Sequence, residues 1–428
     1  MKVTAIKGFS DIFPGEVETW QWVEEQARRV FAAYNFPEIR IPILEKTELF
    51  SRSIGETTDI VEKEMYTFED RDSRSAEATE VTRLTLRPEG TAGVVRAYVE
   101  SEMYKVEPVR KLYYMGPMFR RERPQKGRMR QFHQIGVEAL GRGDPFIDAE
   151  VLLMLDDFFR AVGLETVALE LNSLGCGDCR PGYRQRLLEF LKTREAALCD
   201  NCRRRMQRNP LRVLDCKEPG CRHETKAAPA ILDSLCAPCQ EHFAVVKKLL
   251  SEANVVYALN PRMVRGLDYY CRTTFEWTSD RLGSQSAVAA GGRYDGLVEA
   301  LGGPPIPGVG FAMGVERLVM LLRTNDTAAT ARGPSVYVVW IGEKARDWAF
   351  PIVHRLRREG VVVEMEGETR SMKSQMRRAD KLGAQAVLIV GDDELQKGRA
   401  LLRDMASKQQ EEIALAEIVA KLIPRKAG

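Results

Sequence analysis

The sequence lacks any long apolar segment. No run of about 18 apolar residues, the length that a membrane-spanning helix needs, occurs in its 428 residues. The first residues, MKVTAIKGFSDIFPGE, also lack the apolar centre of a secretory signal peptide. We therefore expect a cytoplasmic protein without a membrane partner.

The chain also has little net charge. Its 64 lysines and arginines nearly balance 61 aspartates and glutamates, which leaves a formal charge of +3. Global electrostatics therefore does not indicate a nucleic-acid-binding protein, and any such partner must be recognised by a local patch. The composition is otherwise that of an ordinary globular protein, and the length allows about two to four domains.

The sharpest basic patch lies between residues 120 and 130. The apolar run KLYYMGPMF precedes it and the half-apolar run FHQIGVEAL follows it, which predicts a strand, a loop and a strand. A solvated face is the ordinary explanation of such a run, but Pro124 and Gly127 favour a shaped hairpin loop. We expect Arg120 and Glu138 to lie close together at the base of this hairpin, where they could hold a phosphate and an amine. Six basic residues face the single acid Glu122 here: Arg120, Arg121, Arg123, Lys126, Arg128 and Arg130.

Cysteine is concentrated in one part of the chain. Eight of the nine cysteines lie between Cys176 and Cys239, and in a cytoplasmic chain this favours free thiols or bound metal over disulfides. Two CxxC pairs could form a four-thiolate zinc site. The uneven intervals and helical surroundings leave a helical module with reduced thiols as the alternative. The CxxC pairs are Cys176 with Cys179, Cys199 with Cys202 and Cys236 with Cys239, and Cys216 and Cys221 complete the group.

The pattern of apolar residues predicts an α+β fold. Short strand-like runs, among them IRIPI at 39–43, are separated by turns and indicate an antiparallel sheet, with helices over 16–34 and 148–161. A polar linker at 324–334 leads to alternating strands and helices. We expect an antiparallel domain in two parts, at 1–173 and 255–325. A helical cysteine-rich insertion at 174–254 would separate the two parts, and a C-terminal α/β domain would follow at 333–428.

Several segments, in order along the chain, resemble the motifs of class II aminoacyl-tRNA synthetases. FAAYNFPEIRIPILEKTELF resembles the first motif, which forms a dimer interface around a proline, here Pro42. FRRERPQKGRMRQFHQIG resembles the second motif and GVGFAMGVERL the third. RGLDYYCRTTFEW, AGGRYDGL and LTLRPEGTAGVVRAY are similar to segments of the histidyl-tRNA synthetase family.

The resemblance implies a two-step reaction with ATP, L-histidine and tRNA(His) as partners. Histidine and ATP would give histidyl-adenylate and pyrophosphate, and the histidyl group would then pass to the 3′ end of the tRNA. It also implies Mg²⁺ with ATP, a homodimer, a catalytic domain interrupted by the insertion, and a C-terminal anticodon-binding domain. Zinc in the insertion goes beyond what the family requires.

Three arginines match family positions at the nucleotide. Arg120 matches the second-motif arginine that holds the α-phosphate and the amino-acid carboxylate, and Arg317 matches the third-motif arginine. Arg265, in RGLDYY, matches the arginine distinctive of the histidine enzymes, which would neutralise the α-phosphate during attack. Arg128 is a further candidate for ATP binding.

The resemblance also implies a histidine pocket with acceptors for an ammonium group and an imidazole N–H. Tyrosines are ordinarily core residues, but the glycines beside Tyr270 and Tyr294 favour a close approach to a ligand. His133 and Cys271 we expect to be structural. The pocket residues are Glu89, Gly90, Thr91, Arg120, Gln134, Glu138, Arg265, Tyr269, Tyr270 and Tyr294.

Contacts with tRNA are expected in three places. Arg123, Gln125 and Arg130 of the hairpin loop match the family's candidates for the extra guanosine pair of tRNA(His). The basic run RRRMQR at 203–208 would face the acceptor stem. A basic helix of the C-terminal domain, with Arg370, Lys373, Arg377 and Arg378, would face the anticodon, although a solvated helix face is an equal alternative.

Three other classes of protein remain as alternatives. The regulatory subunit of ATP phosphoribosyltransferase shares the catalytic fold, but it lacks the C-terminal domain and parts of the motifs. A synthetase for another amino acid would not explain RGLDYY and AGGRYDGL. A redox or zinc-finger module would explain the cysteines alone. The class I signatures HIGH and KMSKS and a Walker A loop are absent.

Overall fold

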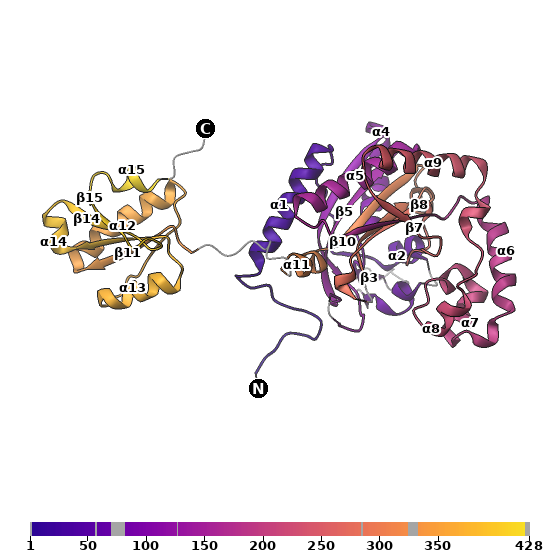
Figure 1. Ribbon diagram of the computed structural model, residues 1–428, viewed down its shortest axis with the longest axis horizontal. Helices are drawn as coiled ribbons and strands as arrows, with labels where there is room; N and C mark the ends of the chain where they lie inside the picture. The colour runs from indigo at the N-terminus through magenta and orange to yellow at the C-terminus, as the bar shows by residue number, and fades with distance from the viewer. Residues whose placement is uncertain are drawn as a thin grey trace, which may run out of the picture. The chain divides into compact units, whose positions relative to one another are not determined.

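The protein folds into two compact units, residues 1–329 and 330–428, and each is described by itself (Figure 1). The expected linker at 324–334 lies mostly outside the described residues, and Lys126 of the basic loop also lies outside them. The computed structural model describes residues 2–55, 58–69, 82–125, 127–283, 286–323 and 333–423.

A seven-stranded sheet forms the centre of the first unit. Its order is β4-β5-β10-β9-β8-β6-β7, and all neighbouring pairs are antiparallel except β6 with β7. The predicted antiparallel sheet and the predicted hairpin, which is β4 and β5, are therefore confirmed. The strands are β4 (Arg110–Phe119), β5 (Gln131–Leu140), β10 (Gly308–Gly314), β9 (Ala287–Arg293), β8 (Cys271–Thr278), β6 (Ala168–Ser173) and β7 (Tyr257–Leu259).

In the described residues, four helices contribute to the main hydrophobic core around this sheet. They are α1 (Val17–Ala33), α5 (Pro145–Ala161), α11 (Val315–Arg323) and, from the insertion, α9 (Ala237–Glu252). The carboxylate of Asp144 accepts the N–H of Phe146 and Pro145 occupies the first turn, so α5 begins three residues before its expected start. Phe31, Phe158 and Phe311 meet in the core between these helices and the sheet. None of the helices in the described residues is long and apolar enough to cross a membrane.

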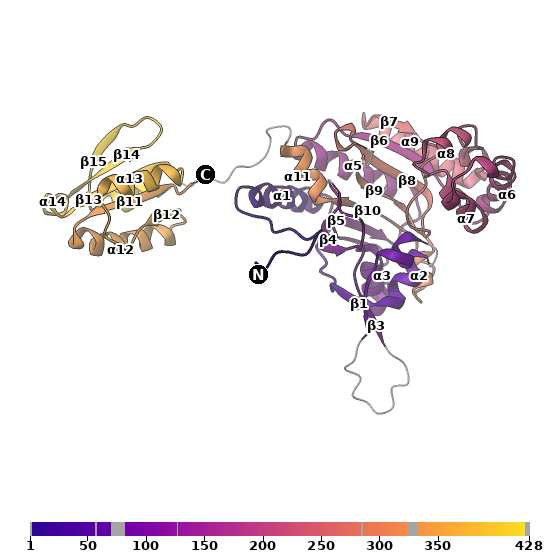
Figure 2. The same cartoon turned by 90° about the horizontal axis from the view of Figure 1, so that it is seen from below.

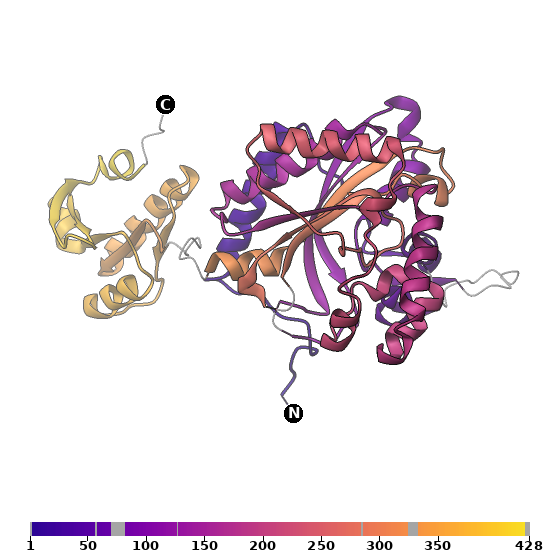
Figure 3. The same ribbon diagram turned by 45° about the vertical axis from the view of Figure 1, so that its right-hand side comes forward.

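The parallel pair β6–β7 has a topological cause. Parallel neighbours need a crossover connection, and the helical insertion is that connection. Figure 2 shows β6 and β7 beside α9 of the insertion, and Figure 3 brings the helices of the insertion forward. The insertion contains α6 (Cys179–Lys192), α7 (Asp200–Arg208), α8 (Pro219–Glu224) and α9 (Ala237–Glu252), with 3₁₀ turns η2 (Glu195–Ala197), η3 (Pro210–Val213) and η4 (Ile231–Ser234).

A smaller sheet of order β1-β3-β2 lies beside the first motif. The expected strand at 39–43 is wrong: only Glu38 forms a bridge, with Tyr113, and the strand starts at Leu44. The carbonyl of Ile41 instead accepts a hydrogen bond of 2.7 Å from the guanidinium of Arg87. The elements here are β1 (Leu44–Lys46), β2 (Tyr66–Glu69), β3 (Arg83–Leu86), α2 (Thr47–Ile54), α3 (Thr91–Glu100), α4 (Met103–Val106), α10 (Leu297–Ala300) and the short helices η1 (Ile60–Glu64) and η5 (Asp280–Leu282).

The second unit is a mixed sheet with helices, as the alternating pattern predicted. Strands β12, β11 and β13 are parallel, whereas β14 and β15 continue the sheet antiparallel. Trp340 and Leu356 lie in its core. The elements are β11 (Val336–Ile341), α12 (Glu343–Arg358), β12 (Val363–Met365), α13 (Met372–Lys381), β13 (Ala386–Gly391), α14 (Asp392–Gln396), β14 (Arg399–Asp404), β15 (Gln410–Ala414) and α15 (Ile418–Leu422).

Candidate active site

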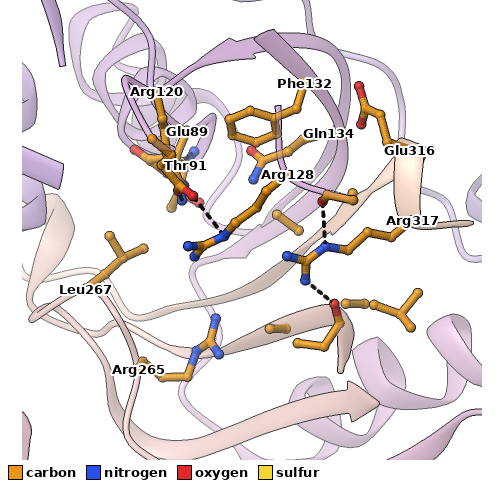
Figure 4. Close-up of a pocket in the computed structure, with 18 of the residues that line it drawn as sticks. Glu89, Thr91, Arg120, Arg128, Phe132, Gln134, Arg265, Leu267, Glu316 and Arg317 are labelled. Carbon is orange, nitrogen blue, oxygen red and sulfur yellow. Dashed lines mark hydrogen bonds and ion pairs between the residues drawn. The ribbon is translucent and has the colours of Figure 1, made fainter. Parts of the chain in front are cut away.

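A cavity of about 280 Å³ opens over the middle of the seven-stranded sheet. The hairpin loop, strands β9 and β10, the start of α11 and the 265–270 loop all contribute side chains to it. Figure 4 shows the guanidinium groups of Arg128, Arg265 and Arg317 pointing into the same space. Segments far apart in the sequence therefore concentrate positive charge in one place.

Arg120 and Arg317 are held in place by backbone carbonyls. Nε of Arg120 donates to the carbonyl of Pro88 at 2.8 Å, and its guanidinium lies 5.2 Å from the ring centre of Phe132. Nε of Arg317 donates to the carbonyl of Gly127 at 3.1 Å, and a terminal nitrogen donates to Ala287. Burial lowers the pKa of the Arg317 guanidinium. Arg317 is bonded to neutral carbonyls and so keeps its positive charge available to an anion, whereas Arg120 also lies 3.7 Å from a carboxylate oxygen of Glu122.

Arg265 and Arg128 are paired with acids. Arg265 forms an ion pair with Glu276 of β8 and lies 5.5 Å from the ring centre of Tyr270. Nε of Arg128 lies 2.8 Å from a carboxylate oxygen of Glu122. An incoming phosphate would therefore compete with carboxylates for these two guanidinium groups.

A buried network of carboxyl and hydroxyl groups lies at the other end of the cavity. Glu89 accepts the N–H groups of Thr91 and Ala92 at 2.7 and 2.9 Å, at the N-terminus of α3 where the helix dipole favours negative charge. Thr91 Oγ1 donates to Glu138 at 2.7 Å, and Tyr294 donates to its second oxygen. Burial raises the pKa of Glu138 to about 8, against the opposing hydrogen bonds from Tyr294 and Thr91. Burial also raises the pKa of Glu89.

Glycines of β10 make room for this network. A Cβ atom at Gly310 would lie 2.1 Å from a carboxylate oxygen of Glu138, and one at Gly308 would lie 2.3 Å from the ring of Tyr294. Both distances are far below van der Waals contact. The glycines of GVGFAMG therefore serve close packing around Glu138 and Tyr294.

The prediction that Arg120 and Glu138 lie together at the base of the hairpin is wrong. Glu138 faces Leu112 in the ladder, whereas the N–H of Arg120 bonds the carbonyl of Arg130 at the other end. Eight residues of β5 separate these positions, roughly 25 Å of strand at about 3.4 Å per residue. Glu89 and Thr91 lie between the two residues and connect the two ends of the site.

Most of the expected site residues line the cavity, although several do not. Gly90, Glu138 and Tyr294 lie outside its lining, and both oxygens of Glu138 already accept hydrogen bonds. Tyr294 contacts the cavity indirectly, since its ring centre lies 5.7 Å from that of Tyr269. The lining includes Glu89, Thr91, Arg120, Arg128, Gln134, Arg265, Tyr269, Tyr270 and Arg317.

The loop residues expected to contact tRNA differ in their exposure and in their hydrogen bonds. Arg123 and Gln125 are exposed. Arg130 is half-buried, and its guanidinium donates to the carbonyls of Glu122 and Lys7 at 3.3 and 3.4 Å. Arg130 is thus engaged with the chain itself.

Two acids at the site were not predicted from the sequence: Glu316 lines the cavity, and Glu276, which is outside the lining, pairs with Arg265. Glu316 accepts the N–H of His133 at 2.9 Å and lies 3.0 Å from its Nδ1, while Trp20 packs edge-on against the same ring. His133 is therefore held as a structural residue. A lone acid within the apolar strand RTTFEWT was the signal for Glu276, and an acid next to Arg317 was the signal for Glu316.

The comparisons with known proteins agree with this geometry. A family model described as histidyl-tRNA synthetase matches residues 8–318. The chain belongs to the histidyl-tRNA synthetase family. A second model, described as an anticodon binding domain, matches residues 335–425. The known reaction of the family is the two-step attachment of histidine to its tRNA.

Similarity to family members extends over the whole chain. The histidine–tRNA ligase of Syntrophotalea carbinolica is 55% identical over 428 residues and covers 100% of both chains. That of Geobacter sulfurreducens is 56% identical over 422 residues, 98% of this chain and 100% of the relative. The crystal structure of apo S. aureus histidyl-tRNA synthetase has a TM-score of 0.83 at 34% identity, and the match covers 99% of this chain and 100% of that one.

Proposed function

We propose that this chain activates L-histidine with ATP and transfers it to the 3′ end of tRNA(His). The convergence of Arg120, Arg265 and Arg317 on one cavity supports this function best. In the first step an oxygen of the histidine carboxylate attacks the α-phosphorus, the bond to the bridging oxygen breaks, and pyrophosphate leaves. Two anions must meet for this to happen, so fixed positive charge lowers the barrier by electrostatic stabilisation and positioning.

The arginines have separate roles in this proposal. Arg120 and Arg265 hold the histidine carboxylate and the α-phosphate together, and Arg265 stabilises the negative charge that develops on the α-phosphate oxygens. Arg317 and Arg128 bind the rest of the nucleotide. No protein nucleophile is needed, because the histidine carboxylate itself attacks.

The buried network at the far end of the cavity would recognise histidine. Glu89 has a carboxylate for the ammonium group or the imidazole, and the Oε1 of Gln134 has no protein partner among the described residues, so it can accept an N–H. Tyr269 and Tyr270 bound the space for the ring, with Tyr294 and Glu138 positioning them from behind. An analogue without an imidazole N–H would leave the buried Oε1 of Gln134 unpaired, which gives strong selectivity.

Magnesium enters this scheme with ATP. Three acids near the arginines already have a partner: Glu122 pairs with Arg128, Glu276 with Arg265, and Glu316 with His133. These contacts suit a Mg²⁺ ion that the nucleotide phosphates hold, with water and few protein ligands. Bound there, Mg²⁺ would neutralise phosphate charge.

We further propose a homodimer that contacts tRNA at both units. Ile43, Leu44 and Phe68 of the small sheet are 43%, 43% and 50% exposed beside Pro42, which supports a partner surface there. Arg123 and Gln125 would contact the acceptor end. Residues 333–428 would bind the anticodon, where Lys373 and Arg377 of α13 lie exposed and without an ion pair among the described residues.

ATP–pyrophosphate exchange measured with each amino acid in turn tests this function. We expect exchange with histidine alone, followed by charging of tRNA(His) when the tRNA is added. Exchange with no amino acid would favour a regulatory relative that binds histidine without charging tRNA. Exchange with a different amino acid would overturn the assignment of the pocket.

A further inference from the structure

The eight cysteines of the insertion form two separate groups of four. Within each group the four sulfur atoms all lie within 4.8 Å of one another. The fold brings cysteines from the two ends of the insertion together in one group, whereas the cysteines of the other group all lie between residues 199 and 221. Cluster A contains Cys176, Cys179, Cys236 and Cys239, and cluster B contains Cys199, Cys202, Cys216 and Cys221.

The distances within each cluster fit a tetrahedral metal site. A zinc ion with four thiolates at about 2.3 Å places neighbouring sulfurs about 3.8 Å apart. In cluster A the Sγ of Cys176 lies 3.6 Å from that of Cys179 and 3.8 Å from that of Cys236. In cluster B the Sγ atoms of Cys199 and Cys216 are 4.0 Å apart. A disulfide would need about 2.05 Å, and all eight thiols are free.

Helix N-termini and backbone amides face several of these sulfur atoms. The second cysteine of each CxxC pair lies in the first turn of a helix, where the dipole stabilises a thiolate: Cys179 in α6, Cys202 in α7 and Cys239 in α9. The N–H of Cys236 donates to the sulfur of Cys179 at 3.2 Å. The N–H of Cys199 donates to the sulfur of Cys221 at the same distance. Such amide bonds orient and stabilise metal-bound thiolates.

The geometry points to one structural zinc ion in each cluster. Four soft thiolates at tetrahedral spacing select zinc among the common divalent ions, and a site with four protein ligands leaves no position for a substrate. Cys179, Cys202, Cys221 and Cys239 are buried among the apolar residues of the insertion, so the clusters are parts of its core.

Cluster A has a particular place in the chain. Cys176 and Cys179 follow the end of β6, and Cys236 and Cys239 begin the helix that returns the chain to β7. A metal there ties the two ends of the insertion together. Arg180, beside Cys179, donates to the carbonyl of Tyr270, and Arg212 of η3, which is nearer to cluster B in the sequence, pairs with Asp268 at 3.2 Å. The inferred zinc therefore fixes the base of the insertion against the loop that carries Arg265.

Metal analysis of the full chain, purified without chelators, tests this inference. We expect two equivalents of zinc per chain. A mercurial that blocks thiols should release both, with four thiols consumed for each zinc. Variants C176S/C179S and C199S/C202S should each retain about one equivalent, whereas Cys271→Ser, a cysteine outside both clusters, should retain two.

Several outcomes would overturn the inference. The first is less than one fifth of an equivalent of zinc in protein whose eight thiols all react. The second is iron in place of zinc. The third is a loss of zinc from Cys271→Ser as large as the loss from the cluster variants. The mercurial titration uses the wild-type chain, so it decides the matter even where a variant fails to fold. Hydrogen exchange adds a structural readout: chelation should expose amides between 176 and 239 and leave β4 and β5 protected.

Discussion

Replacing Arg265 with alanine would test the charge balance of the cavity. The change removes a cation and leaves Glu276 without its partner. Loss of one preorganised group that stabilises developing negative charge costs about 10²- to 10³-fold in rate. The unpaired carboxylate adds repulsion: at an effective dielectric of about 20 and a separation of about 8 Å, two unit charges repel by about 2 kcal/mol, a further factor of about 30. We expect histidine-dependent exchange to fall by the product of the two factors, about 3 × 10³- to 3 × 10⁴-fold.

A double variant separates the two contributions. Glu276→Gln keeps the shape of the side chain and removes its charge, so R265A/E276Q should recover about 30-fold over R265A, in line with the repulsion estimated above. Glu276→Gln alone should change exchange far less, because Arg265 remains. Exchange is measured at saturating ATP and histidine, with thermal unfolding by circular dichroism to verify each fold. Activity of R265A within threefold of wild type would refute the role of Arg265. A double variant no faster than R265A would refute the charge balance.

Three further predictions concern stability, tRNA and assembly. Because burial raises the pKa of Glu138 from its ordinary 4.5 to about 8, its contribution to stability is fully present below about pH 4.5 and is lost as the pH rises through 8, by about 4–5 kcal/mol in all. Glu138→Gln should therefore raise the free energy of unfolding relative to wild type at pH 9 and lose that advantage at pH 5 in guanidinium titrations; a difference independent of pH would contradict the raised pKa. R123A/Q125A should lower kcat/KM for tRNA charging by about 10- to 100-fold and leave exchange within twofold, whereas an equal fall in both would assign the loop to the adenylate step. Ile43→Asp should shift the sedimenting species from dimer to monomer, while the apolar and more exposed control Val256→Asp should not; an unchanged dimer would exclude the surface around Ile43 as the interface.

Local patterns predicted elements well where one short segment decides the conformation. The basic run between two apolar runs predicted the β4–β5 hairpin, and the helical spacing at 16–34 predicted α1 to within one residue at each end. The segment 39–43 has the alternating pattern of a strand but does not form one, because the carbonyl of Ile41 accepts a hydrogen bond from Arg87 and not from a neighbouring strand. That partner lies 46 positions away, beyond the reach of a local pattern.

Contacts between distant segments could not be predicted from the sequence. The register of the hairpin was not visible in it, so Arg120 and Glu138 were placed too close together. The resemblance brought Arg265 to the site but not its counter-ion, Glu276, which approaches from β8. The spacing of the cysteines revealed pairs without revealing which pairs meet. In each case the fold, and not the local sequence, determines the partner.

The parallel strand β7 has a consequence for how such a chain can evolve. Joining two parallel neighbours takes about a dozen residues, so most of the segment from 174 to 256 exceeds what the sheet requires. Evolution can therefore replace most of this segment with another one that carries a different surface, while the sheet that forms the adenylate stays unchanged. A replacement would have to restore the contacts that Arg180 and Arg212 make with residues 266–270.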